Sequence, residues 1–223
     1  VRSQAMQQGV ADLQDNANFG LNYITQDLRL ANLNNLTAEM NDQLLLGGIV
    51  LSQNNYPNPL RPQPDPANPT AVPPPMNQIL LSSSGSGLTN VAQGSDQLVI
   101  QYQPMTVGGF DCEGREITNS NRIIVQRYFL RTDANQATGE TNPLALACDA
   151  GHYAVGDNTV TNYGDAGEII MKRVDYFRVL LNVANATGAQ RYVAINNYLT
   201  LTPRPRILGV SLGVLTRSAQ SVG

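Results

Sequence analysis

Apolar residues recur at every third or fourth position along the first 33 residues of the chain. The residues that follow this spacing are Met6, Val10, Leu13, Ala17, Leu21, Ile24, Leu28 and Ala31. On an α-helix, which has about 3.6 residues per turn, they fall in one stripe along one side. The run contains no Pro, and Gly9 and Gly20 are its weak helix formers. The pattern therefore predicts a helix over 1–33 that is roughly 45 Å long, at about 1.5 Å per residue.

A second side of this predicted helix is also apolar. Phe19 and Tyr23 lie one turn apart on it, and Leu30 also lies away from the first stripe. A helix that is apolar on two sides has to be covered on both. The second face either packs under a loop of the same chain or contacts a neighbouring subunit, and the pattern leaves both interpretations open.

Beyond the helix, the pattern changes to short apolar runs separated by turn residues. We expect strands over Gln43–Ser52 (with a bulge at its two glycines), Ile79–Ser83, Gln97–Gln103, Arg122–Arg131, Leu144–Cys148, Glu168–Val183 and Ile207–Arg217. Residues 192–201 fit either a strand or a short helix. Two segments are expected to be loops: Tyr56–Asn77, which holds nine of the 13 prolines, and the polar Asp149–Gly167. One helix followed by strands predicts an α+β fold, with the helix packed on an antiparallel sheet.

The last predicted strand has two unlike faces. Bulky residues alternate along it with small ones: Leu208, Val210, Leu212 and Val214 against Gly209, Ser211 and Gly213. A face without large side chains lets another backbone approach closely. We therefore expect the long helix to pack against the small face.

The charge and cysteine content of the chain exclude some classes of function. Charged residues make up 14% of the chain and its net charge is −3, so the chain as a whole lacks the basic footprint of a general nucleic-acid binder. Cys112 and Cys148 allow one pairing. In an oxidising compartment they would close a loop of about 37 residues, a constraint worth about 4 kcal/mol by the loop-entropy relation. A metal pair or a redox pair is disfavoured, because the chain has no C-x-x-C and a single His.

The beginning of the chain bears on its location. No run of about 18 apolar residues is present that would form a transmembrane helix. The chain opens at Val1 without an initiator Met and within the helical pattern. We therefore expect a hydrophobic segment upstream of Val1.

Several short motifs, taken in order, resemble those of PilW-like minor type IV pilins. In the helix they are Leu13-Gln14-Asp15-Asn16, Phe19, Leu21, and Asp27-Leu28-Arg29 with Ala31. Further on they are Ser95-Asp96-Gln97-Leu98, Asp111-Cys112-Glu113-Gly114, Tyr128-Phe129, Leu146-Ala147-Cys148, and Val210-Ser211-Leu212 to Thr216-Arg217-Ser218. The chain departs from the family at Leu33–Leu36, where many relatives carry a further cysteine, and in its proline-rich insertion.

The resemblance implies a type IV pilin-like fold in two parts. Residues 1–33 would be the C-terminal half of the pilin helix, whose hydrophobic half anchors the subunit in the inner membrane. Val1 would lie near the junction of the two halves. Residues 34–223 would form the globular head, with the proline-rich loop 56–77 and the disulfide-closed loop 112–148. Phe19, Tyr23 and Leu30 would then contact other pilin subunits.

The same resemblance implies a non-enzymatic function. Such a minor pilin, matured by a prepilin peptidase, moves from the inner membrane and periplasm to the surface pilus of a Gram-negative bacterium. Together with other minor pilins and the major pilin it would prime pilus assembly or sit in the tip complex. It would thereby support twitching motility, adhesion and, in competent bacteria, DNA uptake. The periplasmic route agrees with a disulfide.

Two further functions remain as alternatives. One is a minor pseudopilin of a type II secretion system, which has the same architecture. The other is a tip adhesin or DNA receptor, in which the loops Tyr56–Asn77 and Asp149–Gly167 bind DNA or a host surface.

Candidate chemistry in the sequence is sparse. His152 is the single His and lies in a polar segment, so we expect neither catalysis nor a cofactor. Asp149, Asp157, Asn158, Asp165 and Glu168 lie close in sequence and could hold Ca²⁺, with Asp157, Asp165 and Glu168 as the central ligands. An ordinary solvated loop is the simpler interpretation, because the spacing is not that of an EF-hand.

A small basic group is also present in the sequence. Arg204 and Arg206 flank Pro205, and Arg191 lies nearby. These arginines could contact DNA phosphates or be ordinary surface residues.

Overall fold

The computed structural model describes residues 2–37, 39–135 and 139–218. Its fold class is α+β, as the sequence predicts: one long N-terminal helix packs against antiparallel sheets. Val1, where the junction with an upstream anchor is expected, lies outside the described residues.

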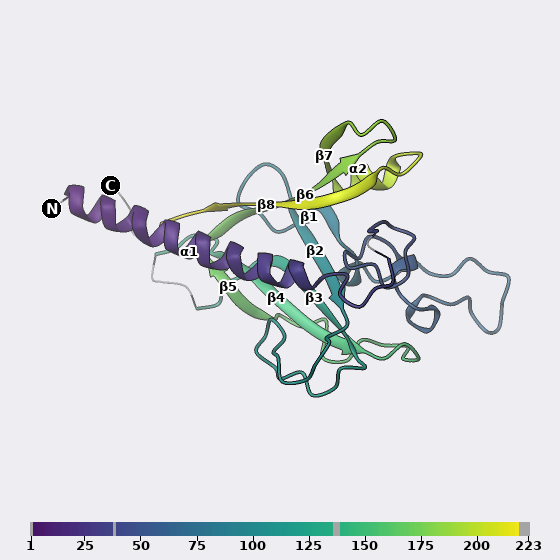
Figure 1. The fold of residues 1–223 in the computed structure, drawn as a ribbon. Helices are drawn as coiled ribbons and strands as arrows, with labels where there is room; N and C mark the ends of the chain where they lie inside the picture. Colours follow the sequence, from purple (N-terminus) through teal and green to yellow (C-terminus); the bar gives the residue numbers. More distant parts are fainter. Residues whose placement is uncertain (1, 38, 136–138, 219–223) are drawn as a thin grey trace.

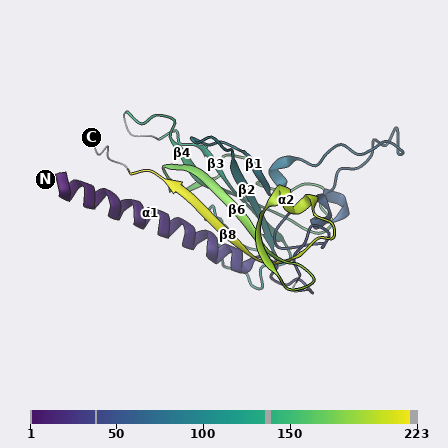
Figure 2. The same cartoon turned by 90° about the horizontal axis from the view of Figure 1, so that it is seen from above.

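Helix α1 spans Arg2–Leu30, close to the predicted range. It ends there because Asn32 and Asn34 adopt the left-handed conformation, with φ of 68° and 61°. Its 29 residues extend over about 44 Å, at about 1.5 Å per residue. Only the second half lies on the sheets, and the N-terminal half projects beyond them (Figures 1 and 2).

Eight strands form two antiparallel sheets. The first has the order β1-β2-β3-β4-β5, with β1 at Ser83–Gly87, β2 at Ser95–Tyr102, β3 at Ile123–Thr132, β4 at Leu144–Tyr153 and β5 at Glu168–Lys172. The second has the order β7-β6-β8, with β6 at Val174–Ala184, β7 at Gln190–Ala194 and β8 at Arg206–Thr216. The short helix α2 at Ile195–Thr200 follows β7, so the ambiguous segment 192–201 forms both kinds of structure.

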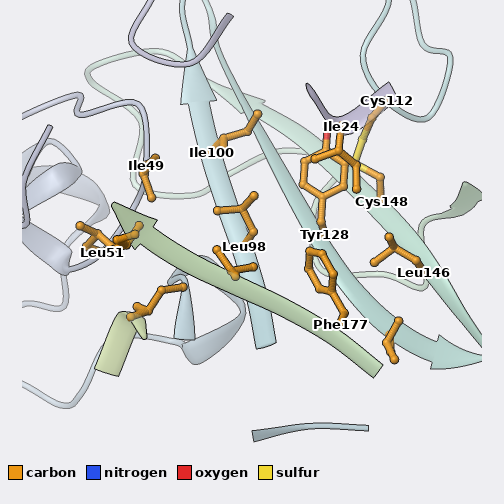
Figure 3. Close-up of a cluster of buried hydrophobic side chains, with 14 of the residues drawn as sticks. Ile24, Ile49, Leu51, Leu98, Ile100, Cys112, Tyr128, Leu146, Cys148 and Phe177 are labelled. Carbon is orange, nitrogen blue, oxygen red and sulfur yellow. A yellow bond between two sulfur atoms is a disulfide. The ribbon is translucent and has the colours of Figure 1, made fainter. Parts of the chain in front are cut away.

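The main hydrophobic core lies between the two sheets and under α1 (Figure 3). Helix α1 contributes Ile24, which is completely buried, and the first sheet contributes Leu98 and Tyr128. Phe177 of β6 packs into the same cluster from the second sheet. The core therefore joins all three layers into one body.

The expected single strand over Glu168–Val183 is wrong, because the chain divides it between the two sheets. Arg173 adopts a positive φ of 55°, which turns the chain between β5 and β6. β5 then pairs with β4, whereas β6 pairs with β7 and β8. This turn is the reason that the fold has two sheets.

The expected strand over Gln43–Ser52 is also wrong, since only Ile49 forms an isolated bridge, with Ile100. Leu46 has a positive φ of 61°, and a Cβ at Gly48 would lie 2.1 Å from the backbone nitrogen of Asn32. The segment folds tightly against the end of α1, and this prevents an extended ladder.

Two shorter predictions need correction in the same way. The apolar run Ile79–Ser83 is mainly the 3₁₀ turn Gln78–Leu80, and β1 begins only at its last residue. The loop expected over Asp149–Gly167 begins later, because β4 continues to Tyr153.

The expected packing of the helix on the small face of β8 is wrong. An added Cβ at Gly209 would meet no atom within 4 Å, and one at Gly213 would lie 3.8 Å from Cβ of Arg178. The bulky residues Val210, Leu212 and Val214 instead pack against the main core. The close approach of the helix backbone occurs at Gly20, whose Cβ would lie 2.3 Å from Cε of Met171 on β5.

Both ends of the proline-rich loop 56–77 are packed into the head. Tyr56, Leu60 and Met76 are buried in a second core cluster, with Val99 and Val125 of the first sheet. The residues between these ends are mostly exposed and extend away from the head (Figure 1).

Candidate functional site

The N-terminal part of α1 presents an uncovered apolar surface. Met6 is 58% exposed, Val10 is 51% exposed and Phe19 is 70% exposed. Met6 and Val10 belong to the stripe that reaches the core at Ile24, but the head does not extend far enough to cover them. Phe19 lies on the opposite side of the helix, because nine residues after Val10 correspond to about two and a half turns. We call Met6, Val10 and Phe19, which lie on two sides of α1, the exposed helix surface.

A groove continues the apolar stripe along the head. It lies between α1 and β8, has a volume of about 390 Å³, and is lined mainly by apolar side chains that include Leu21, Leu28, Met40, Val210 and Leu212. Most of these side chains are only half-buried. The helix is therefore incompletely covered even where it lies on the sheets.

The three residues expected to contact other subunits have different surroundings. Phe19 is exposed, as described above. Tyr23 is half-buried, packs against the main core and donates a hydrogen bond to the carbonyl oxygen of Cys112 at 3.4 Å. Leu30 packs against the small cluster formed by Tyr102, Ile117 and Ile124. The second face is thus covered by the head from Tyr23 onward.

A buried polar network fixes α1 on the first sheet. The hydroxyl of Tyr128 donates to Oδ2 of Asp27 at 2.5 Å, and Nε2 of Gln126 donates to the same oxygen at 3.0 Å. Burial raises the pKa of the Asp27 carboxyl, and the two hydrogen bonds partly offset this rise. This role of Asp27 could not be assigned from the sequence, because its partners Gln126 and Tyr128 are about 100 residues away along the chain.

The network also reaches the disulfide. The backbone N–H of Cys112 donates to Oε1 of Gln126 at 3.1 Å. Cys112 and Cys148 are disulfide-bonded, as expected in an oxidising compartment, with a Cα–Cα distance of 6.1 Å. Both are buried in the main core (Figure 3). The bond therefore ties the 112 loop to β4 directly under the helix.

His152 lies among charged groups and lines a cavity of about 220 Å³ together with Asp111, Arg115 and Arg122. It is half-buried on β4, and its backbone pairs with Thr161. Burial lowers the pKa of its imidazole, and the nearby guanidinium groups of Arg122 and Arg115 lower it further. None of the hydrogen bonds of the described residues joins this imidazole to an acid or a nucleophile.

Among the expected calcium ligands, the structure brings Asp149 and Asp165 together but does not group the central three, Asp157, Asp165 and Glu168. The Asp157 carboxylate accepts a hydrogen bond from the N–H of Ala154 at 2.8 Å, and that of Asp165 accepts one from Gly167 at 2.8 Å. Glu168 lies on β5 opposite Cys148.

A different acidic group forms instead, from Glu113, Asp149 and Asp165, with one oxygen of each within 4.8 Å of the others. Burial raises the pKa of Asp149 and of Glu113. Arg127 forms an ion pair with Asp149 at 2.9 Å, and Arg115 forms one with Glu113. These guanidinium groups neutralise much of the negative charge, so the arrangement is explained as a polar link between β3, β4 and the 112 loop. Glu113 was missed in the sequence because it lies far from the other acids along the chain.

The three arginines of the basic group do come together. Arg191, Arg204 and Arg206 line one cavity of about 760 Å³ between the β6–β7 turn and the segment before β8. The β6–β7 turn and the segment before β8, which line it, lie near α2 and far from the start of α1 (Figures 1 and 2).

The chain matches no protein-family model, no curated protein and no solved structure. Among the described residues, no helix has the length and apolar character needed to cross a membrane.

Proposed function

We propose that this chain belongs to a minor pilin that works by assembling with other pilins. The exposed helix surface carries this proposal, because Met6, Val10 and Phe19 are each more than half exposed on a helix that projects from its own head. Apolar surface of this kind is typical of a protein interface. The resemblance to PilW-like minor type IV pilins supports the choice of partner, which is the helix of another pilin.

The free energy gained by burying these three side chains is too small to hold two isolated chains in a tight dimer. Burying the exposed part of each of the three side chains contributes roughly 1–2 kcal/mol. Partners on both sides of the helix would be needed to reach their sum of about 3–6 kcal/mol, which lies near or below the entropic cost of bringing two proteins together. Isolated chains should therefore associate weakly. Stable association therefore requires contacts beyond these three side chains.

The structure explains how such a helix keeps a fixed direction. Asp27 links it to β3, and Asn16 donates a hydrogen bond to the carbonyl oxygen of Lys172 on β5 at 2.9 Å. Gly20 lets the helix backbone lie directly on Met171. Because the helix is held at several points, the orientation of its N-terminal half relative to the head is fixed. In the proposed mechanism, α1 packs among helices of other minor pilins and the major pilin, and the head faces outward.

In the cell this assembly would prime pilus formation or belong to the tip complex, and so support twitching motility and adhesion. A minor pseudopilin of a type II secretion system would use the same geometry. Co-purification distinguishes the two functions. A minor pilin should recover other pilins, whereas a minor pseudopilin should recover components of the secretion pseudopilus.

The test is a triple substitution of the exposed helix surface in the full-length protein of its own bacterium. Met6→Gln, Val10→Gln and Phe19→Gln together should lower both surface piliation and co-purification of other minor pilins at least tenfold. The head should keep its melting temperature, since these side chains contribute little to the core.

The chain offers a matched control on the loop before the disulfide. Met105, Val107 and Phe110 are 69%, 57% and 65% exposed, so they repeat the same three residue types at similar exposure. Their replacement by Gln should leave piliation unchanged. If the control variant loses piliation and the helix variant does not, assembly uses the loop and the proposed mechanism is wrong.

A further inference from the structure

The cavity that contains His152 lies on one face of the first sheet. His152 on β4 pairs with Ile124 on β3, and Ile124 pairs with Tyr102 on β2, so these three side chains project to the same face. Ile117 packs against Tyr102 and Ile124, which places the segment 111–119 over this face. The cavity of about 220 Å³ therefore lies between that segment and the strands.

The lining of this cavity contains one fixed ion pair and two charged groups without a partner. Arg115 forms an ion pair with Asp111 at 3.0 Å, so these two side chains contribute little net charge. Arg122 and Glu116 also line the cavity, and none of the ion pairs of the described residues includes either of them. One free positive group and one free negative group therefore line the same small space.

The imidazole of His152 adds a neutral polar group to the lining. Burial lowers its pKa, and the guanidinium groups of Arg122 and Arg115 lower it further. At neutral pH the imidazole is therefore uncharged and has one N–H donor and one nitrogen acceptor. It can contact either end of a polar ligand.

We propose that this cavity binds a small zwitterion, a free α-amino acid, with its carboxylate on Arg122 and its ammonium group on Glu116. A guanidinium donates two parallel hydrogen bonds to a carboxylate, and an ammonium group donates to the carboxylate of a glutamate. A ligand with a single charge would leave one of the two side chains without a partner, whereas a zwitterion pairs with both.

The size and charge of the cavity restrict the ligand further. Its volume lies below the roughly 300–1,000 Å³ of sites for drug-sized molecules, so it fits an amino acid with a short side chain, such as alanine. A polyanion is disfavoured, because the carboxylates of Asp111 and Glu116 would repel it. None of the described residues of α1 lines the cavity, so this inference does not depend on the proposed assembly.

His152 reports on this cavity directly, because it is the single His of the chain. Its imidazole proton signals in an NMR spectrum are followed while alanine is added to the folded chain at constant pH and ionic strength. The signals should shift saturably. Acetate and methylammonium, which carry one charge each, should bind at least about tenfold more weakly than alanine, because each makes only one of the two charge-assisted contacts. The proposal is overturned if alanine gives no saturable shift up to roughly 10 mM, or if either single-charge probe binds as tightly as alanine.

Two single variants locate the two ends of the ligand. Arg122→Gln should weaken alanine binding about tenfold or more and abolish the response to acetate. Glu116→Gln should weaken alanine binding to a similar extent and abolish the response to methylammonium, while the response to acetate remains. Both side chains are exposed, so the melting temperature should stay unchanged.

Matched controls change the net charge in the same way outside the cavity. Arg29→Gln and Glu168→Gln replace exposed side chains that do not line it, and they should leave the affinity for alanine unchanged. Equal effects of the control and cavity variants would mean that binding depends on net charge alone, and the site would be rejected. Tighter binding of inorganic phosphate or glucose than of alanine would overturn the assignment to a zwitterion. Piliation by the Glu116→Gln variant should be normal, so failure of this site and failure of the proposed assembly are seen in different assays.

Discussion

Gly20 and Gly9 lie in the same helix, yet their replacement by Ala should have opposite effects. Ala is favoured over Gly in a helix by about 1 kcal/mol, and this gain applies to both positions. At Gly9 the nearest atom to an added Cβ is Cβ of Ser218 at 3.9 Å, an ordinary contact. At Gly20 the added Cβ would lie 2.3 Å from Cε of Met171 and 3.1 Å from its Cβ.

The contact with Met171 determines the size of the effect. The methyl end could rotate away, but Met171 is 1% exposed and belongs to the main core. Its Cβ can move only with the backbone of β5. Overpacking of this kind costs typically 1–3 kcal/mol. After the helical gain, Gly20→Ala should destabilise the fold by about 0–2 kcal/mol, whereas Gly9→Ala should stabilise it by up to about 1 kcal/mol.

Urea unfolding followed by circular dichroism measures both free energies, provided that the m-value is unchanged. A double-mutant cycle adds a specific test: Met171→Ala should cost less in the Gly20→Ala background than in the wild type, because it removes the clash. If Gly20→Ala stabilises the protein as much as Gly9→Ala does, the close approach of the helix to β5 is not real.

Three further predictions concern the core and the loop. Cys148→Ala should lower the free energy of unfolding by about 4 kcal/mol in oxidising buffer, and an unchanged value would show that the disulfide does not constrain the unfolded chain. Burial raises the pKa of Asp27 above its ordinary 3.8, so the folded state binds this proton more tightly than the unfolded state. The contribution of Asp27 should therefore lower the melting temperature as the pH rises from about 3.8 through the raised pKa of its carboxyl. In the Asp27→Asn variant, the melting temperature should depend less on pH over this range. Deleting residues 62–75 should leave the melting temperature nearly unchanged, whereas deleting 56–77 should unfold the head because Tyr56 is completely buried; equal melting temperatures would contradict the role of the loop ends.

The sequence predicted the elements whose pattern is local. Helix α1 has a long, uninterrupted stripe, and β2 and β3 have strong alternation or many β-branched residues, so each was placed within a few residues. The helix and the strands depend on neighbours in the chain, which the pattern contains. The disulfide joins residues 36 apart in sequence and was predictable because the chain has two cysteines, which allow one pairing.

The failures depend on contacts between distant segments. Arg173 in the left-handed conformation divides an apolar run into strands of different sheets, and no glycine marks the place. Met6 is exposed because the head does not cover it, and the apolar pattern of the helix does not contain this information. The acidic group at Glu113 and the cavity lined by Arg191 and Arg206 form only after the sheets have assembled.

The order of the elements in the chain has a consequence for how the protein is made. Helix α1 comes first and β8 comes last, yet both cover the same core, and β6 lacks one of its two neighbours until β8 is present. The core therefore cannot close before β8 has been synthesised. Folding should be slow, as expected for a topology with many distant contacts.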